Sequence, residues 1–372
     1  MEAEQRRLVV KIGSSSLTNS EGGLNRDRLD YYATEIASLQ KQGYQMLLVT
    51  SGAVAAGFRA IGFTERPRAM HEKQACAAVG QALLMRSYQE SFGRHGIVAA
   101  QILLTRADFS DRQRVNNALM TIEELLQRGV IPIVNENDTV SVDEIKLKFG
   151  DNDKLSALAA NLVKAGRLLI LTDTDGLYTA DPRYDTTAQR IERVDQIQES
   201  LFAIAGGAGS AVGTGGMRSK VEAARIATRG GIPVFVGKAT ETGDLRAACA
   251  GTGKGTYFDT VLHSLPIKKQ WVGFYSVPEG CIHVDHGAAN AILHQGRSLL
   301  PAGVTEVDGD FHPGDVLEVV DPEGHIIGRG VSNYEAWQLR AAAGFNSDEV
   351  KRRVDVQRIE VIHRDEWIVL QP

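Results

Sequence analysis

One strand-and-turn segment, residues 8–16 (LVVKIGSSS), constrains the fold of this chain more than any other stretch. Its aliphatic residues are typical of a central strand that is covered on both faces. Lys11 interrupts this run, and a buried ammonium group is costly unless an anion lies close to it. Gly13 and the serines that follow let the backbone approach a ligand closely. We predict that Lys11 points at a phosphate group beyond the strand; the alternative is a lysine at a sheet edge whose ammonium reaches solvent.

Strand and helix patterns alternate from this segment onward. A helical pattern over 28–41 precedes a second aliphatic strand, 46–50, which ends directly before Ser51 and Gly52. Such alternation indicates a parallel sheet with right-handed crossovers, in which ligands bind beyond the carboxyl ends of the strands. Ser51 can therefore bind an anionic group, although the same residues would also fit an ordinary tight turn between strand and helix.

Polar residues follow two further strands. The strand 130–134 runs into 135–138 (NEND), whose amide and carboxylate groups suit an ammonium ion, although a loop with Asx turns would also explain them. The strand 168–171 runs into 172–178 (TDTDGLY), which suits a ribose or an adenine edge. A plain turn around Asp175 is the alternative there.

Two segments that precede helices carry more polar or flexible residues than a helix start needs. In 149–154 (FGDNDK) one residue would suffice as a cap, so Asp153 is a candidate for holding cationic side chains. The glycine-rich stretch 206–220 opens a helix over 221–228, and free backbone N–H groups there can cradle phosphate oxygens beside Lys220. The stretch is neither a Walker motif nor a GxGxxG motif after a strand, and a flexible linker is its alternative.

Composition narrows the class of protein. A length of 372 residues predicts two domains, and the net charge of −5 argues against a general nucleic-acid binder. Three widely spaced cysteines fit a reducing cytoplasm and give no zinc motif. The N-terminus lacks the apolar core of a signal peptide, and we find no apolar run long enough to span a bilayer.

Two lysines far apart in the sequence, a glycine cradle and several polar strand ends together suggest phosphoryl transfer from a nucleotide. No histidine lies near these motifs as an obvious general base. A carboxylate acceptor is already ionised at neutral pH and needs none, whereas a hydroxyl acceptor usually does.

The order and spacing of these motifs resemble those of bacterial glutamate 5-kinases, a group of the amino acid kinase family with a C-terminal PUA domain. The segments that carry the resemblance are 10–15, 49–57, 135–138, 149–157, 176–183 and 213–217. The resemblance implies ATP-dependent phosphorylation of the γ-carboxylate of L-glutamate to L-glutamyl 5-phosphate, the first step of proline biosynthesis. Other amino acid kinases, acting on aspartate, N-acetylglutamate or UMP, are the alternative. The segment 143–150, which contains Lys146, looks slightly longer than is usual in the family.

The resemblance also assigns roles to individual residues. Lys11 and Lys220 would stabilise the transferring phosphoryl group, and Asp153 would organise both lysines. Ser51, Asp138 and Asn152 would bind glutamate. The ATP-binding residues would be Lys11, Thr172, Asp173, Thr214, Gly215, Gly216, Met217, Arg218, Ser219 and Lys220. Mg²⁺ would be held mainly by phosphate oxygens and water, so no protein ligand is expected.

The C-terminal part has a different pattern. Short β-like runs at 282–284, 316–320 and 326–331 are separated by turns, which predicts a small β-barrel, and 298–304 resembles a PUA module. Six basic and thirteen acidic residues lie between 277 and 355, opposite to an RNA-binding footprint. An RNA-binding or RNA-modifying PUA protein, the function of a different class, is therefore disfavoured.

The expected fold is an α/β three-layer sandwich with a mainly parallel central sheet, the amino acid kinase fold, plus the PUA barrel. The expected boundaries are 1–265 for the catalytic domain, 266–275 for a linker, 276–357 for the PUA domain and 358–372 for a tail. The family further implies a cytoplasmic homo-oligomer, dimer or tetramer, with proline as feedback inhibitor and glutamate-5-semialdehyde dehydrogenase as functional partner. No RNA or membrane association is expected.

Overall fold

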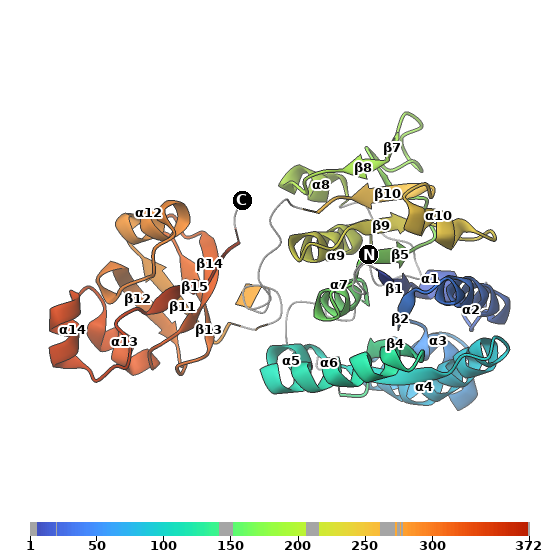
Figure 1. Ribbon diagram of the computed structural model, residues 1–372, viewed down its shortest axis with the longest axis horizontal. Coiled ribbons are helices and arrows are strands. Elements are labelled where there is room, and N and C mark those ends of the chain that lie inside the picture. The colour runs from blue at the N-terminus through green and yellow to red at the C-terminus, as the bar shows by residue number, and fades with distance from the viewer. Residues whose placement is uncertain are drawn as a thin grey trace. The chain divides into compact units, whose positions relative to one another are not determined.

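The computed structural model describes residues 6–19, 21–140, 152–205, 216–260, 272–273, 276 and 278–370. The chain divides into two compact units (Figure 1). The first comprises Met1–Asp108 and Arg112–Ser264, and the second comprises Phe109–Asp111 and Leu265–Pro372. Most of the expected linker, 266–275, lies outside the described residues.

The first unit is built on an eight-stranded sheet with the order β3-β4-β2-β1-β5-β9-β10-β8. Neighbouring strands run parallel, except that β10 runs antiparallel to β9. The strands are β1 (Arg7–Ile12), β2 (Gln45–Thr50), β3 (Ala99–Leu104), β4 (Ile131–Glu136), β5 (Arg167–Leu171), β8 (Arg193–Val194), β9 (Val234–Gly237) and β10 (Gly255–Phe258). A separate two-stranded sheet pairs β6 (Leu177–Tyr178) with β7 (Arg190–Ile191).

Helices cover both faces of the large sheet. Helices α6, α7 and α9 pack on one face and α2, α4 and α10 on the other (Figure 1). The helices of this unit are α1 (Ser14–Leu17), α2 (Arg26–Lys41), α3 (Ala53–Gly57), η2 (Arg59–Ile61), α4 (Met70–Gly93), α5 (Arg106–Ser110), α6 (Arg112–Gln127), α7 (Asn152–Leu162), α8 (Glu199–Ile204), α9 (Met217–Arg229) and α10 (Asp244–Ala250). This arrangement confirms the predicted three-layer α/β sandwich.

Strand β1 lies in the middle of the sheet, between β2 and β5, and all of its residues are buried. Leu8, Val10 and Ile12 belong to the hydrophobic core that includes side chains of α2 and α4. Because side chains alternate across a strand, Lys11 faces the opposite side, where α7 packs. The buried position of Lys11 confirms a central strand rather than a lysine at a sheet edge.

The second unit contains a five-stranded sheet with the order β12-β11-β13-β14-β15 and its own hydrophobic core. Its elements are β11 (Gly280–Val284), α12 (His286–Gln295), η4 (Pro301–Gly303), β12 (Val304–Gly309), β13 (Val316–Val320), β14 (Ile326–Ser332), α13 (Ala336–Ala342), α14 (Ser347–Arg353) and β15 (Ile362–Val369). An antiparallel bridge between Leu299 and Ile362 joins the segment before β12 to β15, so the sheet curls as a small barrel does.

Strand β15 corrects one expected boundary. The segment 358–372 was expected to be a tail outside the domain, but β15 pairs antiparallel with β14 inside the sheet. The physical reason is burial: Ile362, Trp367 and Ile368 are 1%, 6% and 3% exposed, which places their apolar area in the interior of this unit.

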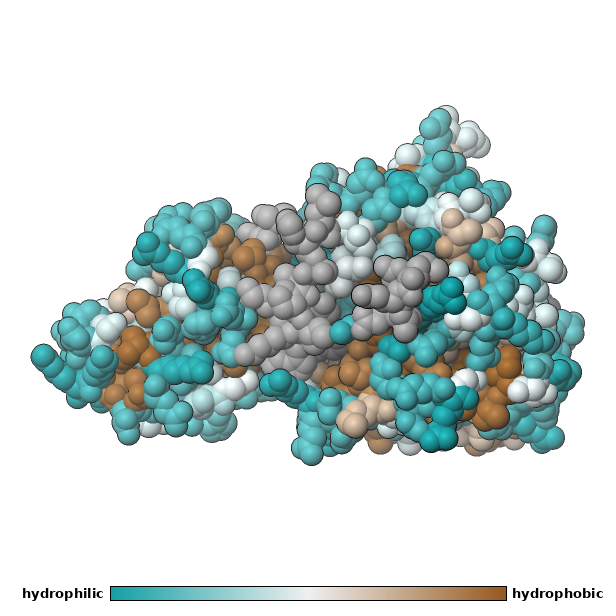
Figure 2. All heavy atoms as spheres, in the orientation of Figure 1, coloured by the Kyte–Doolittle hydropathy of each residue, from teal (hydrophilic) through white to brown (hydrophobic). Residues whose placement is uncertain are grey.

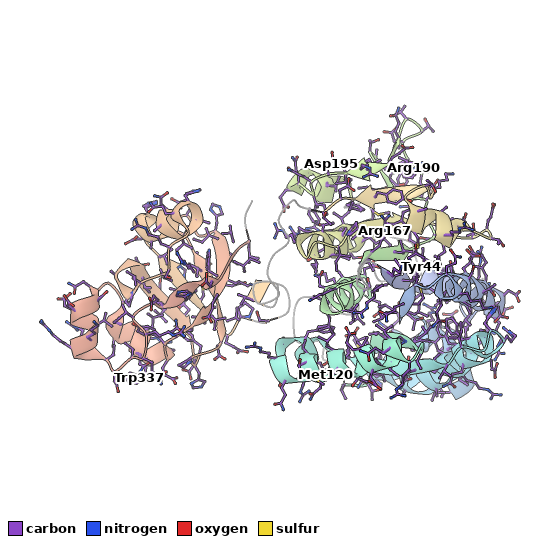
Figure 3. All side chains as sticks on the ribbon, viewed as in Figure 1. Tyr44, Met120, Arg167, Arg190, Asp195 and Trp337 are labelled. Carbon is purple, nitrogen blue, oxygen red and sulfur yellow. The ribbon has the colours of Figure 1, made fainter. Side chains whose placement is uncertain are left out.

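Polar side chains cover most of the visible surface, and apolar residues appear there as scattered patches (Figure 2). Of the apolar residues labelled in Figure 3, Met120 on α6 and Trp337 on α13 are the most exposed, with exposed fractions of 65% and 62%. Of the helices in the described part of the chain, none combines the length and the apolar character that a membrane span requires.

Candidate active site

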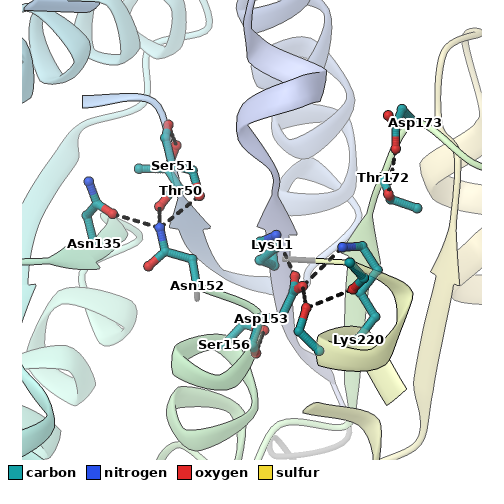
Figure 4. A network of polar contacts seen from close by, with 12 residues as sticks. Lys11, Thr50, Ser51, Asn135, Asn152, Asp153, Ser156, Thr172, Asp173 and Lys220 are labelled. Carbon is teal, nitrogen blue, oxygen red and sulfur yellow. Dashed lines mark hydrogen bonds and ion pairs between the residues drawn. The ribbon is translucent and has the colours of Figure 1, made fainter. Parts of the chain in front are cut away.

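The candidate site lies at the carboxyl ends of the central strands of the first unit (Figure 4). Lys11 comes from β1, Ser51 follows β2, Asn135 lies in β4, and Thr172 follows β5. Parallel strands bring their carboxyl ends to one edge of the sheet, so these side chains converge although they are far apart in the sequence.

Asp153, in the first turn of α7, joins the two predicted lysines. Its Oδ1 lies 2.5 Å from Lys11 Nζ, and its Oδ2 lies 3.1 Å from Lys220 Nζ. The Ser219 hydroxyl donates a hydrogen bond of 2.8 Å to the same Oδ2. Helix α9 begins at Met217, which places both Ser219 and Lys220 in its first turn. One carboxylate therefore holds side chains from β1 and α9 together.

The charged groups of this cluster are buried. Asp153 is fully buried, and Lys11 and Lys220 are only 5% and 6% exposed. Burial alone raises the pKa of Asp153, but the two lysines outweigh that effect and hold its pKa well below the usual range. In the contacts described above, two ammonium groups face one carboxylate, an arrangement that favours binding of an anionic group beside the lysines.

Asn152 connects this cluster to the end of β2. Its Nδ2 donates to the Thr50 carbonyl at 2.7 Å, to Ser51 Oγ at 2.8 Å and to Asn135 Oδ1 at 3.0 Å. Gly52, next to Ser51, has a φ of 108°, a left-handed conformation that favours glycine. This turn leads into α3 and fixes the direction in which Ser51 presents its hydroxyl.

A second group of polar residues lies at the end of β4. Asp138 lines a cavity of about 260 Å³ together with Gln81, Gln101, Glu136 and neighbouring residues of α4 and β3. Burial raises the pKa of Asp138 to about 6. Asn135 and Glu136 were expected in a loop beyond the strand, but β4 includes both, and both are buried, at 2% and 5% exposure.

A larger cavity of about 790 Å³ opens beside Lys220. Thr172, Asp173, Gly216 and Met217 line it, together with residues 174–178. The Thr172 hydroxyl donates to Asp173 Oδ1 at 3.1 Å. This volume is within the range of small-molecule sites, and its polar lining, which includes Lys220, suits a phosphorylated ligand.

The remaining predicted residues fall into two groups. Thr214 and Gly215 lie outside the described residues, as does Lys146. Arg218 does not line the larger cavity; its guanidinium carbon lies 5.9 Å from the centre of the Phe202 ring of α8. The structure thus brings Lys11, Lys220, Asp153, Asn152 and Ser51 together and turns Arg218 toward α8.

Sequence reasoning missed several residues around the site. Lys238 and Lys254 line the larger cavity, and Lys254 pairs with Asp175 at 3.0 Å. Lys238 directly follows β9, a strand for which we made no prediction. Had that strand been predicted, Lys238 would have been a candidate for the same reason as Ser51, because ligands bind beyond the carboxyl ends of parallel strands. Gln81 is a second omission, because an alanine-rich helix gave no sign that one of its amides reaches the site.

The described residues contain no cluster of three or more His, Cys, Asp and Glu side chains arranged to hold a metal ion. Asp153 lies nearest to both lysines, and its two oxygens already accept contacts from Lys11, Lys220 and Ser219. It is therefore ill suited to serve as a cation ligand in this state.

Residues 6–238 match the family model described as the amino acid kinase family. The chain belongs to the amino acid kinase family. Residues 280–354 match the PUA domain. A curated glutamate 5-kinase from Bacillus cereus (strain ATCC 10987 / NRS 248) is 46% identical over 99% of this chain and 100% of its own length. A glutamate 5-kinase from Geobacillus kaustophilus (strain HTA426) is 47% identical over 99% of this chain and 98% of its own.

Among solved structures, the chain is similar to a carbamate kinase from Giardia lamblia, with 16% identity and a TM-score of 0.49. That match covers 70% of this chain and 100% of the other. The amino acid kinase match covers most of the first unit and the PUA match lies in the second, so the candidate site is within the amino acid kinase part of the chain.

Proposed function

We propose that this protein transfers the γ-phosphoryl group of ATP to the γ-carboxylate of L-glutamate, forming L-glutamyl 5-phosphate in the first step of proline biosynthesis. One structural observation carries the proposal: Lys11 and Lys220 both contact Asp153 at the carboxyl edge of the sheet. Full-length similarity to glutamate 5-kinases supports glutamate as the acceptor.

The two lysines act on the phosphoryl group. In phosphoryl transfer the charge is spread over the oxygens of the transferring group, and catalysis depends mostly on positioning and on nearby cations. Lys11 approaches from β1 and Lys220 from α9, so the two ammonium groups can contact different oxygens of that group. Asp153 is a positioning residue because it holds both ammonium groups.

The acceptor carboxylate is ionised at neutral pH and attacks without a general base. Ser51, Asn152 and Asp138 bind glutamate on the side of the lysines that faces β2 and β4. Asp138, when ionised, attracts the α-ammonium group of the substrate. The Asn152 Oδ1 is buried and has no hydrogen-bond partner among the described residues, so it can accept from the same ammonium.

ATP occupies the larger cavity, with Thr172 and Asp173 beside the nucleoside and Lys220 beside the phosphates. Mg²⁺, when bound with ATP, would supply further positive charge and would be held mainly by phosphate oxygens and water. The protein contributes the shape of the cavity and the two fixed ammonium groups.

A Lys220→Ala variant, assayed with glutamate, hydroxylamine and MgATP, tests the proposal. Because a cation that stabilises the transition state is lost, hydroxamate formation should fall by about a hundred- to a thousandfold. Lys41→Ala, which removes an exposed lysine from the last turn of α2, is the matched control and should retain wild-type activity. Unchanged hydroxamate production by Lys220→Ala would remove Lys220 from the mechanism.

The acceptor is tested on the wild-type protein by ADP release with glutamate, aspartate, N-acetylglutamate and UMP in parallel. Glutamate should be the preferred acceptor. Phosphorylation of UMP without phosphorylation of glutamate would refute the proposed function.

A further inference from the structure

Four amide side chains form a continuous hydrogen-bonded row, the amide chain, which consists of Asn152, Asn135, Gln81 and Gln101. Asn152 Nδ2 donates to Asn135 Oδ1 at 3.0 Å, and Asn135 Nδ2 donates to Gln81 Oε1 at 2.8 Å. Gln81 Nε2 then donates to Gln101 Oε1 at 2.9 Å. The amide chain therefore runs from the candidate glutamate site through β4 and α4 to β3.

Backbone groups fix the direction of this amide chain. The Glu136 N–H can only donate, and it donates to Asn135 Oδ1 at 3.0 Å. The Thr50 carbonyl can only accept, and it accepts from Asn152 Nδ2 at 2.7 Å. An amide has one donor end and one acceptor end, so Asn135 must present Nδ2 to Gln81, and Gln81 must present Oε1 to Asn135.

This direction determines which atom Asn152 offers to a ligand. Its Nδ2 faces Thr50, Ser51 and Asn135, so its Oδ1 is the end left for the site. If the Asn152 amide turned over, its oxygen would face the Thr50 carbonyl and its NH₂ would face the substrate. A donor there would repel an ammonium group that an acceptor attracts.

Gln81 completes the arrangement from α4. Asn135 and Gln81 are 2% and 9% exposed, so solvent has little access to replace a lost hydrogen bond between them. We propose that Gln81 is a positioning residue: by accepting from Asn135 Nδ2 it holds Asn135, and with it Asn152, in the orientation that the Glu136 N–H and the Thr50 carbonyl favour. The site thereby selects a ligand with a hydrogen-bond donor, the α-ammonium group of an amino acid. The proposal rests on the proposed function, because that function supplies the ammonium group.

Gln81→Met tests this role because it keeps the length of the side chain and removes both hydrogen-bonding groups. Asn135 Nδ2 then loses its partner, and KM for glutamate should rise about tenfold. The KM for ATP and kcat should stay near the wild-type values, since Gln81 does not line the larger cavity. An unchanged KM for glutamate, or parallel rises in both KM values, would overturn the inference.

Ser87→Ala is the matched control on the same helix. Ser87 is also buried, at 5% exposure, and its hydroxyl donates to the Leu83 carbonyl of α4 rather than to the amide chain. This variant should leave KM for glutamate unchanged, which separates a general disturbance of α4 from loss of the amide chain.

A crystal structure of Gln81→Met gives a readout that does not depend on activity. We expect the Asn135 amide to leave its contact with Asn152 Nδ2 or to turn over. If the contact between Asn135 and Asn152 is unchanged, the positioning role is wrong whatever the substrate is. Failure of the proposed function would appear separately, as a wild-type protein that does not phosphorylate glutamate.

Discussion

Burial raises the pKa of Asp138 to about 6, so this side chain changes charge within the pH range in which the protein can be assayed. An ionised Asp138 attracts the ammonium group of glutamate, and a protonated one does not. The pH dependence of kcat/KM reports the ionisation of groups in the free enzyme, which makes it the appropriate measurement.

We predict that kcat/KM for glutamate falls as the pH is lowered through about 6. Asp138→Asn should have a low kcat/KM that changes little between about pH 5 and about pH 8, because the carboxyl group that titrates in this range is absent. A wild-type profile that is flat across this range, or an Asp138→Asn profile that still falls, would contradict the role of Asp138.

Stability measurements separate this effect from unfolding. The raised pKa means that the folded protein binds the Asp138 proton more tightly than the unfolded chain does, so ionisation of Asp138 destabilises the fold as the pH rises. Urea unfolding should therefore show Asp138→Asn to be more stable than the wild type above pH 6, with the advantage lost near the unfolded pKa of about 4.

Single residues differ in how far the sequence could predict them. Lys11 and Asp153 were predictable because a charge in a buried strand and surplus polar residues at a helix start both require a partner. The prediction that both lysines share one carboxylate is consistent with the contacts to Asp153. Gln81 was not predictable, because its partner Asn135 is 54 positions away and both residue types are common on surfaces.

At the scale of elements, two glycines allow α3 and α4 to pack backbone against backbone. A Cβ atom on Gly80 would lie 1.8 Å from the Ala53 carbonyl oxygen, and one on Gly57 would lie 2.0 Å from the Cys76 carbonyl oxygen. Helix α3 begins directly after Ser51 and Gly52, and α4 carries Gln81 next to Gly80. The close approach therefore sets the position of two sides of the candidate glutamate site.

Gly80→Ala should separate these helices. We expect a loss of about 1–3 kcal/mol in the free energy of unfolding, together with a raised KM for glutamate, because overpacking forces the backbones apart. Gly93→Ala at the end of α4 is the control: nothing lies within 4 Å of its Cβ position, so it should not destabilise the protein. Denaturant unfolding and steady-state kinetics on both variants check this, and a fully stable Gly80→Ala would contradict it.

The sequence predicted β1, β2 and β5 better than β9 and β10, which lie between β5 and the β8 edge of the large sheet. Strands β1, β2 and β5 are short aliphatic runs, and the structure places them where the patterns indicated. We made no prediction for β9 and β10, which have four residues each, and β10 reverses direction against β9. Helices α7 and α9 begin three or four residues before the predicted starts. Their first turns are mostly polar, so the apolar pattern used for prediction did not mark them.

At the scale of the whole molecule, each unit has its own hydrophobic core. The described site residues, from Lys11 to Lys220, all lie in the first unit. We predict that a chain ending at Ser264 folds and retains most of the glutamate kinase activity, since a unit with its own core can fold independently. Circular dichroism establishes whether the shortened chain is folded, and a folded but inactive product would show that the second unit is required for catalysis.

The contacts of Asp153 have one last consequence, which concerns each catalytic cycle. Lys11 and Lys220 are already drawn to one carboxylate before any nucleotide arrives. Bringing two like charges together inside a protein is unfavourable, and here that work is done once, during folding. The reaction therefore needs little reorganisation of the protein when the phosphoryl group enters, because its electrostatic surroundings are prepared in advance.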